Sequence, residues 1–384
     1  MLLERMYFMN KRNIFLLFTM GFLQGMVFYA PVATLYRQAV GISVFGITLI
    51  ESISLALTIL LEIPWGIAAD RIGYRKTMLI CCFLFCISKI IFWQAVDFTG
   101  FLLERILLAV VCSGLSGVDA AMLYESCGEG NSHRIFGIYE YLQQLGLLLA
   151  AGVTGIWIGD HYRLAGFLTV LSYGAAALLA VFLQEVKPAC VRKVTLCESL
   201  AVLSGQLKNR KLLYFLLAIA LLNETHQTIM VFLNQLQYVQ AGMTVTMISG
   251  AYILLSAAGL SSIFSARLSV FWGEKQLGCG LISGSILCCL LLALTKSPLL
   301  SVAAVTGLRL FYGLLQPLQM TYQNRQIVAE HRATALSVNT ALMSGLGVFL
   351  NLVFGHAAKV SLPVSMLLGA GLCLAALLLY RKSV

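Results

Sequence analysis

Twelve long apolar runs, separated by short polar breaks, constrain this chain more than any other feature. A helix that crosses a bilayer needs about 20 apolar residues, and the runs reach that length. Only 11% of the 384 residues are charged, whereas a soluble domain carries about 25%. We therefore predict an all-α polytopic membrane protein whose main solvent is lipid. The predicted spans are 13–36, 44–69, 77–97, 101–124, 135–158, 164–183, 212–236, 243–265, 277–295, 299–322, 333–355 and 361–380.

The positive charges are distributed unevenly along the chain, which has a net charge of +10. If the N-terminus is cytoplasmic, nineteen Lys and Arg residues fall in inner segments and four in outer loops. This bias follows the positive-inside rule and places both termini in the cytoplasm. We attribute the charge to topology and anionic lipid headgroups, so we expect no nucleic-acid partner. We expect a multi-pass protein of the plasma membrane.

A basic, polar stretch near the midpoint divides the twelve spans six and six. We predict an N-terminal six-helix bundle over 12–183, a cytoplasmic linker over 184–210 and a C-terminal six-helix bundle over 211–381. Within the linker, 195–207 has leucines at helical spacing and is either an amphipathic helix on the inner membrane face or an ordinary connection. Similar residues recur at offsets near 200, such as Arg105 with Arg309 and Cys81 with Cys288.

The break between the second and third spans carries four charges and two glycines in eleven residues, Gly66 to Lys76. Because such a segment cannot lie in hydrocarbon, it must form a tight turn at the water interface. Gly73 permits the turn, and Asp70 can accept N–H bonds at a helix N-terminus. Arg75 then needs an acidic partner, for which Glu125 has the appropriate depth. The alternative is that these charges are only interfacial residues.

The spacing G-x-x-x-D-R-x-G-x-R-K resembles the signature loop of the major facilitator superfamily, and the resemblance covers about residues 12–381. It implies two pseudo-symmetric six-helix bundles with the substrate path between them, similar to bacterial drug or metabolite exporters. In the transporters that it resembles, the loop latches one state of the transport cycle. The implied latch residues are Gly66, Asp70, Arg71, Gly73, Arg75, Lys76 and Glu125. The second half lacks the aspartate, so we expect an asymmetric latch.

Carboxylates at membrane depth are costly and are functional candidates by default. Glu224 lies near the middle of its span, with His226 beside it. Each could bind and release protons, or serve as a buried structural group. Asp119 and Glu140 are further candidates for a cavity lining, and Asp119 could instead pair with inner-loop arginines. The proton-coupling candidates are Glu224, His226, Asp119, Glu140 and Arg105; the last resembles the superfamily's arginine in the fourth helix but could simply pair with Glu104.

Polar uncharged residues concentrate on a few spans, together with one arginine. Amides and phenols in an apolar cavity suit recognition of an amphipathic organic molecule, although helix–helix hydrogen bonding is the alternative role. Arg309 could contact an anionic substrate or pair with Glu224. The candidates for a substrate cavity are Gln24, Tyr29, Gln143, Gln144, Asn223, Gln227, Arg309, Gln316, Gln319 and Asn339.

No motif for an enzyme or an ATP-driven pump occurs, because H-E-x-x-H, G-x-S-x-G and G-x-x-x-x-G-K-[ST] are all absent. The eleven cysteines form no C-x-x-C pair, so we expect no metal and no cofactor. We predict a monomeric secondary transporter that works by alternating access, with protons and a small molecule as partners. Proton-coupled efflux of an amphipathic compound or drug is the leading hypothesis; proton-coupled uptake of a small anionic or polar metabolite is the alternative.

Overall fold

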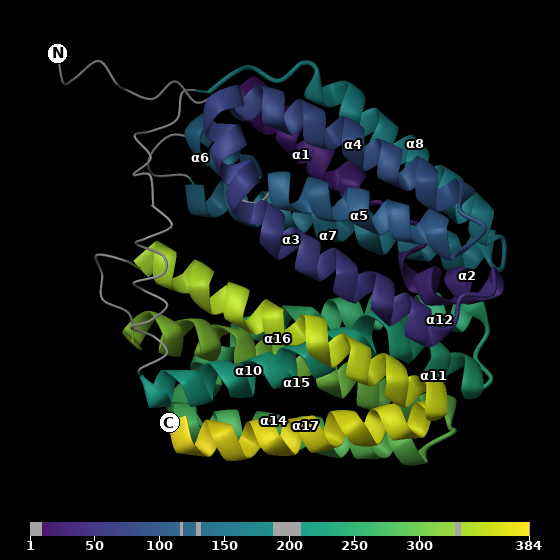
Figure 1. The fold of residues 1–384 in the computed structure, drawn as a ribbon, viewed down its shortest axis with the longest axis vertical. Helices are drawn as coiled ribbons and strands as arrows, with labels where there is room; N and C mark the ends of the chain where they lie inside the picture. Colours follow the sequence, from purple (N-terminus) through teal and green to yellow (C-terminus); the bar gives the residue numbers. More distant parts are fainter. Residues whose placement is uncertain (1–9, 116–117, 128–131, 187–208, 327–331, 384) are drawn as a thin grey trace. The chain divides into compact units, whose positions relative to one another are not determined.

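The computed structural model describes residues 10–115, 118–127, 132–186, 209–326 and 332–383 (Figure 1). All regular elements in these ranges are helices, which confirms the all-α prediction. The segment 195–207, with most of the predicted linker, lies outside the described residues. The chain divides into two compact units, one of residues 1–32 and 57–192 and the other of residues 33–56 and 193–384.

The first unit contains helices from the N-terminal half of the chain, with α3 entering it from the second unit. Its elements are α1 (Lys11–Gly25), η1 (Ala30–Val32), the later part of α3 (Val44–Ile72), α4 (Tyr74–Gln94), α5 (Phe98–Leu115), α6 (Val118–Cys127), α7 (Ser132–Val153), η2 (Thr154–Ile158) and α8 (Tyr162–Ala180). Its core lies between α1, α4, α6, α7 and α8. Helix α4 packs along both α5 and α8, and α1 packs along α7.

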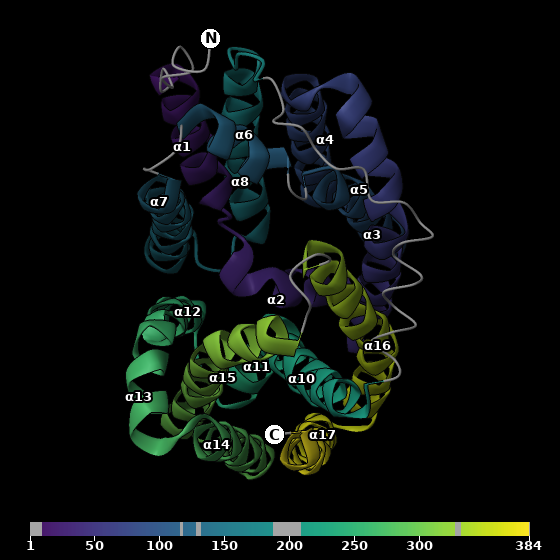
Figure 2. The ribbon, with the colours of Figure 1, turned by 90° about the vertical axis from the view of Figure 1, so that its left-hand side faces the viewer.

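The second unit contains the C-terminal helices together with 33–56. Its elements are α2 (Ala33–Ala39), the first part of α3, α10 (Arg210–Thr228), η3 (Ile229–Leu233), α11 (Asn234–Gln240), α12 (Val245–Ala258), η4 (Gly259–Phe264), α13 (Ser265–Trp272), α14 (Glu274–Leu294), α15 (Pro298–Gln326), α16 (Arg332–Val360) and α17 (Leu362–Ser383). Figures 1 and 2 show α14 and α17 side by side, in agreement with their contacts.

Specific contacts explain why 33–56 groups with the second unit. The backbone N–H of Thr34 on α2 donates to Oε1 of Gln235 on α11 (2.8 Å). On α3, Thr48 packs so close to Gly355 of α16 that a Cβ there would collide with its hydroxyl. Small residues allow membrane helices to approach in this way. The predicted bundles instead assign 33–56 to the first half, and the boundaries of those bundles stay a prediction.

The helices agree with the predicted membrane spans. In the described part of the chain, eleven helical segments are long and apolar enough to cross a membrane. A shorter apolar helix, Val245–Ala258, lies where the remaining span is predicted. The chain is therefore a multi-pass membrane protein with a helix count close to twelve. The first span differs from the prediction, because the helix expected over 13–36 is interrupted after Gly25.

Helix starts recur at a constant offset of 200 residues, which supports the predicted internal repeat. The pairs are Tyr74 with Glu274, Phe98 with Pro298, Ser132 with Arg332 and Tyr162 with Leu362. The residue pairs that suggested the repeat are nevertheless out of register. Arg105 corresponds to Val305, so Arg309 lies about one helical turn further along. Cys81 and Cys288 are about two turns out of register, so neither pair is equivalent.

Two glycines bring the backbones of α1 and α7 into contact. A Cβ at Gly25 would collide with the carbonyl oxygen of Gln143, and one at Gly146 would collide with that of Phe22. No larger side chain fits at either position without moving a backbone. This close approach positions the side chains of α1 and α7 around one space inside the first unit.

The interruption of α1 leaves backbone groups that an intact helix would pair, and hydroxyls from η2 and α8 bind them. In a bilayer such groups need a partner inside the protein, because water is absent. The contacts are Ser172 to the carbonyl of Leu23, Tyr173 to that of Gln24 (2.7 Å), Thr154 to that of Phe28 (2.6 Å), and the N–H of Phe28 to Thr169 (3.0 Å). The interruption is therefore a built feature of the fold.

Replacing Thr154 by Val should destabilise the protein, because it leaves the buried carbonyl of Phe28 without its hydroxyl donor. An unsatisfied buried polar group costs about 1–3 kcal/mol. We expect a clear fall in the thermal unfolding temperature of the purified protein. Thr19→Val is the matched control, because Thr19 bonds only the carbonyl of Phe15 within its own helix. Equal stabilities of the two variants would contradict the proposed role of Thr154.

Candidate functional site

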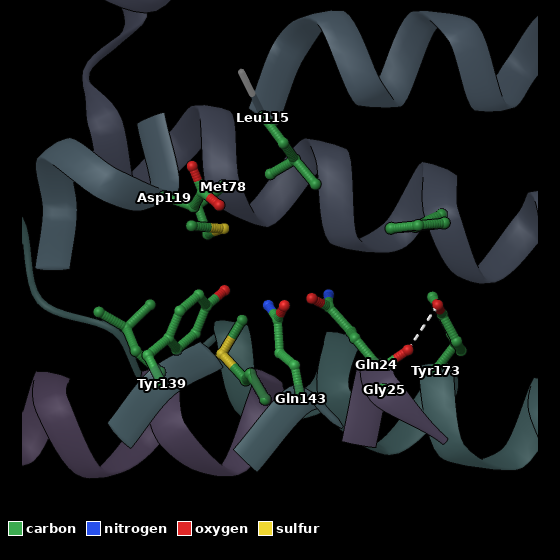
Figure 3. A pocket seen from close by; sticks show the side chains of 11 residues that line it. Gln24, Gly25, Met78, Leu115, Asp119, Tyr139, Gln143 and Tyr173 are labelled. Atoms are coloured by element: carbon green, nitrogen blue, oxygen red, sulfur yellow. Dashed lines mark hydrogen bonds between the residues drawn. The ribbon is translucent and has the colours of Figure 1, made fainter. Parts of the chain in front are cut away.

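A cavity of about 260 Å³ lies inside the first unit, at the interruption of α1 (Figure 3). It brings together three residues that the sequence singled out from three different spans: Gln24, Asp119 and Gln143. The lining residues are Leu17, Met20, Gln24, Gly25, Met78, Phe85, Leu115, Asp119, Tyr139, Gln143 and Tyr173. The lining therefore combines apolar side chains with amides, phenols and one carboxyl group.

The polar groups of the cavity are arranged along its length. Figure 3 shows Asp119 and Tyr139 toward one end and Tyr173 toward the other, with the amides of Gln143 and Gln24 between them. Oδ1 of Asp119 accepts the backbone N–H of Ala120 (2.7 Å), in the first turn of α6, where a negative charge is favoured. The cavity thus has a distinct acidic end.

The interruption of α1 positions the side chains at the end of the cavity opposite Asp119. The Tyr173 hydroxyl donates to the carbonyl oxygen of Gln24 (2.7 Å), and the Gln24 amide contacts Sγ of Cys82 (3.5 Å). The Tyr173 ring meets that of Phe85 edge to face, with centroids 4.7 Å apart. These two rings form an aromatic end wall, defined by Phe85 and Tyr173.

A buried lysine lies behind the aromatic end wall. Lys89 on α4 is only 4% exposed, and its Nζ lies 3.0 Å from the hydroxyl oxygen of Tyr29. Tyr29, which the sequence proposed as a cavity residue, is not among the residues lining this cavity. It instead stacks on Phe92 and holds the lysine. Lys89 is not among the residues predicted from the sequence to have a function.

The second unit holds the carboxylate favoured for proton coupling. Glu224 is buried on α10 with 5% exposure, and its Oε1 accepts from the Thr228 hydroxyl (3.3 Å). The carboxylate of Glu51, on the part of α3 in this unit, is close enough to repel it electrostatically. Helix α16 approaches at Gly347, where a Cβ would lie 2.6 Å from Oε2 of Glu224. Glu224 is therefore confined by a glycine, a hydroxyl and a second acid.

His226 lies in a different environment from Glu224, although both belong to α10. Its ring stacks on Tyr312, with centroids 3.9 Å apart and an angle of 12° between planes. The Tyr312 hydroxyl donates to Oδ1 of Asn223. Both ring nitrogens of His226 are buried, and neither has a hydrogen-bond partner among the described residues. The stack joins α10 to α15, and Tyr312 is a neighbour that the sequence did not identify.

The remaining cavity candidates are dispersed. Arg309 packs against Gly259, where a Cβ would lie 2.8 Å from its Nη2, and none of the hydrogen bonds or ion pairs between described side chains joins it to Glu224. Asn339 is fully buried, and within the described part of the chain its amide has no hydrogen-bond partner. Glu140, Gln227 and Gln316 are exposed, and Gln144 and Gln319 are half-buried.

The signature turn is shorter than the eleven-residue motif suggests. Helix α3 continues to Ile72 and α4 begins at Tyr74, so Gly73 alone lies between them, with a φ of +94°. That φ favours glycine. Gly66 and Asp70 are helical residues of α3 whose surroundings lie outside the described part, whereas Arg71 and Lys76 are exposed.

The acidic side chain at this turn is Glu185. Its Oε1 accepts the backbone N–H of Arg75 (3.1 Å), while the Arg75 guanidinium donates to the carbonyl oxygen of Val181 (3.1 Å). Glu185 thus caps the N-terminus of α4, where a negative charge is favoured. The pairing of Arg75 with Glu125, expected for one state of a transport cycle, stays a prediction. Arg105, by contrast, contacts Glu104 here, with 3.6 Å between Nε and Oε2.

The corresponding turn of the second unit is held differently. Gly273, with a φ of +78°, separates α13 from α14. Glu274 then pairs with Arg325 through two hydrogen bonds of 2.7 and 2.9 Å. The repeat therefore conserves the glycine turn while the charged contact changes, so the described part of the two turns is asymmetric.

The sequence contained a signal for one of the missed residues. Lys89 lies within the apolar run 77–97, and the rule that charges at membrane depth are functional candidates applies to it as to the carboxylates. Tyr139, Tyr173 and Tyr312 carried no such signal, because tyrosines are common in membrane helices. In the described part of the chain, no group of three or more His, Cys, Asp or Glu residues could hold a metal ion.

Comparisons with known proteins give a consistent result. The sequence pattern of the Major Facilitator Superfamily matches residues 14–351, although no curated protein sequence matches the chain. The fold is similar to that of nucleoside transporter NupG, with a TM-score of 0.79, 15% identity, and 98% of this chain and 99% of NupG covered.

Two further solved structures share the fold. One is a bacterial homolog to the human lysosomal transporter Spinster, inward-facing and unoccupied, with a TM-score of 0.70, 17% identity, and 97% of this chain and 91% of that chain covered. The other is the human organic anion transporter MFSD10, with a TM-score of 0.62 and 16% identity. The match covers 97% of this chain and 99% of MFSD10. At these identities the likeness establishes the fold alone.

Replacing Glu185 by Ala should weaken the N-terminus of α4, because it removes the acceptor of the Arg75 N–H. Loss of a helix cap costs about 1 kcal/mol. We expect a lower thermal unfolding temperature, whereas Glu185→Gln should retain part of the effect because it keeps an acceptor oxygen. Asp160→Ala, at another exposed turn of the same unit, serves as the control. An unchanged unfolding temperature in Glu185→Ala would refute the capping role.

Proposed function

This chain belongs to the major facilitator superfamily, whose members are transporters and not enzymes, and we propose that it moves a small amphipathic organic molecule across the plasma membrane by alternating access coupled to protons. The observation that carries this proposal is the cavity of about 260 Å³ inside the first unit. Alternating access requires that a binding site open to one side of the membrane at a time. We further propose a monomer with both termini in the cytoplasm.

The lining of the cavity supports an amphipathic substrate. Met20, Met78 and Leu115 provide apolar contact, and the amides of Gln24 and Gln143 can each donate and accept hydrogen bonds. Small-molecule sites typically combine a mostly apolar surface with a few polar groups that fix orientation. Methionine side chains also adapt to ligands of different shape. This combination suits an organic molecule with an apolar body and polar substituents.

The surroundings of Glu224 support proton coupling. A carboxylate that lies at membrane depth beside a second acid, Glu51, gains from binding a proton, because protonation removes both a buried charge and a repulsion. Thr228 supplies a hydrogen bond that persists in either protonation state. Glu224 is therefore the group that we assign to proton binding and release.

Efflux by proton antiport is the direction that we propose. Asp119 is the charged side chain that lines the cavity, and a carboxyl group favours a cationic or neutral amphipathic compound, as expected of a drug exporter. Proton-coupled uptake of a small anionic or polar metabolite remains the second candidate, and the observation that favours it is the buried Lys89 behind the aromatic end wall.

Vesicles that contain the purified protein and are subjected to a pH jump test the function directly. A panel of amphipathic cations, neutral compounds and anions should contain at least one that accumulates only with the proton gradient. Glu224→Gln keeps the shape of the side chain but cannot release a proton, so it should abolish accumulation while substrate exchange persists. Undiminished accumulation by this variant would exclude Glu224 as the coupling group.

A matched pair of glycine variants makes this test more specific. Gly347→Ala should displace the Glu224 carboxylate, since the new Cβ would lie 2.6 Å from Oε2, whereas Gly345→Ala meets no atom within 4 Å. We expect slower proton-driven accumulation in Gly347→Ala and normal accumulation in Gly345→Ala. Failure of every compound to accumulate or exchange would overturn the transport proposal itself.

Cysteine accessibility tests alternating access. After replacement of the native cysteines, a cysteine at Gln143, which lines the cavity, should react with a polar thiol reagent from one side of the membrane, and substrate should change its rate. Ala150→Cys, two turns further along α7 and fully buried, is the control and should not react. Reaction at position 143 from both sides at once would indicate a channel, and no reaction in any condition would indicate a structural protein.

A further inference from the structure

We propose that the cavity of the first unit binds a small planar heterocycle with a cyclic-amide edge, in which a ring N–H stands next to a C=O group. The side-chain amides of Gln24 and Gln143 recognise this edge. The inference rests on the proposed function and names the substrate class of the same site. It makes Gln24 and Gln143 the residues that determine which compounds bind.

The backbones of α1 and α7 hold these two glutamines next to each other. At Gly25 the helices approach so closely that a Cβ would collide with the carbonyl oxygen of Gln143. The carbonyl oxygen of Gln24 accepts the Tyr173 hydroxyl (2.7 Å), which fixes the end of α1 on α8. Groups that are held in place before a ligand arrives lose less conformational freedom when it binds. The two amides are therefore a preformed pair.

Both amides line the cavity and can bind a ligand there. Figure 3 shows them next to each other, between Tyr139 and Tyr173. No hydrogen bond joins the two amides in the part of the chain that the structure describes. The Gln24 amide nitrogen donates to Sγ of Cys82 (3.5 Å), and a thiol is a weak acceptor. Each amide carries two N–H donors and a carbonyl oxygen, so both can donate to a ligand and accept from it.

A cyclic-amide edge matches this chemistry better than a charged group does. One side-chain amide pairs with an adjacent donor and acceptor on a planar ring through two hydrogen bonds, as Asn and Gln pair with the edge of adenine in DNA. A carboxylate only accepts, so it would leave the amide oxygens without a donor. An ammonium group only donates, so it would leave the amide N–H groups without an acceptor. A neutral ring with both groups on one edge satisfies both needs.

The rest of the lining suits a small flat molecule. Met20, Met78 and Leu115 give apolar contact, and the aromatic end wall presents two rings that meet edge to face, with centroids 4.7 Å apart. Aromatic ligands pack favourably against such rings. Sites for drug-sized ligands measure about 300–1,000 Å³, whereas this cavity measures about 260 Å³. The volume therefore favours a ligand of one or two fused rings.

Three probes of nearly the same shape test the inference by equilibrium binding. Isoquinolin-1(2H)-one has the cyclic-amide edge, isocoumarin replaces its ring N–H by an oxygen atom, and 2-methylisoquinolin-1(2H)-one replaces the hydrogen by a methyl group. Isothermal titration calorimetry on the full chain in lipid nanodiscs, with empty nanodiscs as the baseline, should give the first probe about tenfold or more higher affinity. The reason is that a buried acceptor left without its donor is costly. Equal affinities, or no binding of any probe, would overturn the inference.

Variants assign the preference to the two glutamines. Gln24→Met and Gln143→Met keep a side chain of similar length but remove the amide. Each should lower the affinity for isoquinolin-1(2H)-one toward that for isocoumarin, while isocoumarin binds nearly as in the unmodified protein, which also shows that the variant is folded. Gln144→Met is the matched control, because Gln144 is the next residue on α7 and is not among the residues that line the cavity. A preference that survives in either cavity variant would refute recognition by the two amides together.

Binding and transport results distinguish this inference from the proposed function. If isoquinolin-1(2H)-one binds selectively but no compound accumulates in vesicles, the recognition of the cyclic-amide edge holds and the transport proposal fails. If other compounds accumulate with the proton gradient while isoquinolin-1(2H)-one binds no better than isocoumarin, transport holds and the assigned substrate class fails.

Discussion

The absence of water from the bilayer core is the constraint on which the rest of this structure depends. Every backbone N–H and C=O at that depth must find a partner within the protein. An unbroken helix meets the requirement automatically, but α1 ends at Gly25 in the middle of the first span. The hydroxyls of Thr154, Thr169 and Tyr173 meet it instead. The break can exist only because η2 and α8 supply those groups.

The same break produces the cavity. Gly25 and Gly146 let the backbones of α1 and α7 touch, which places Gln24 and Gln143 beside each other at the point where α1 stops. The Tyr173 hydroxyl binds the carbonyl of Gln24 and its ring closes one end of the space. A single local departure from helical geometry thus accounts for the polar lining, the end wall and the access of both amides to a ligand.

Hydropathy was sufficient to predict the spans, because the need for long apolar segments is independent of tertiary contacts. It did not predict the break in α1, although Gly25 and Pro31 lie on either side of it and a proline disrupts the helical turn that precedes it. The sequence also could not predict that Gln24, Asp119 and Gln143 line one cavity, because this depends on how each helix is rotated about its own axis. The depth of Lys89 in its span was enough to predict that it has a function. The capping role of Glu185 was not predictable, because Arg75, whose backbone N–H it accepts, is 110 residues away in sequence.

The assignment of residues 33–56 to the second unit has a consequence for how the chain is made. Membrane helices enter the bilayer in order of synthesis, so α2 and the first part of α3 are inserted long before α11 and α16 exist. Gln235, which binds the backbone of Thr34, and Gly355, which receives Thr48, both appear late in translation. Residues 33–56 are therefore surrounded by lipid until their contact partners in the second unit have been synthesised. Assembly of the second unit finishes only when the last third of the polypeptide has left the ribosome.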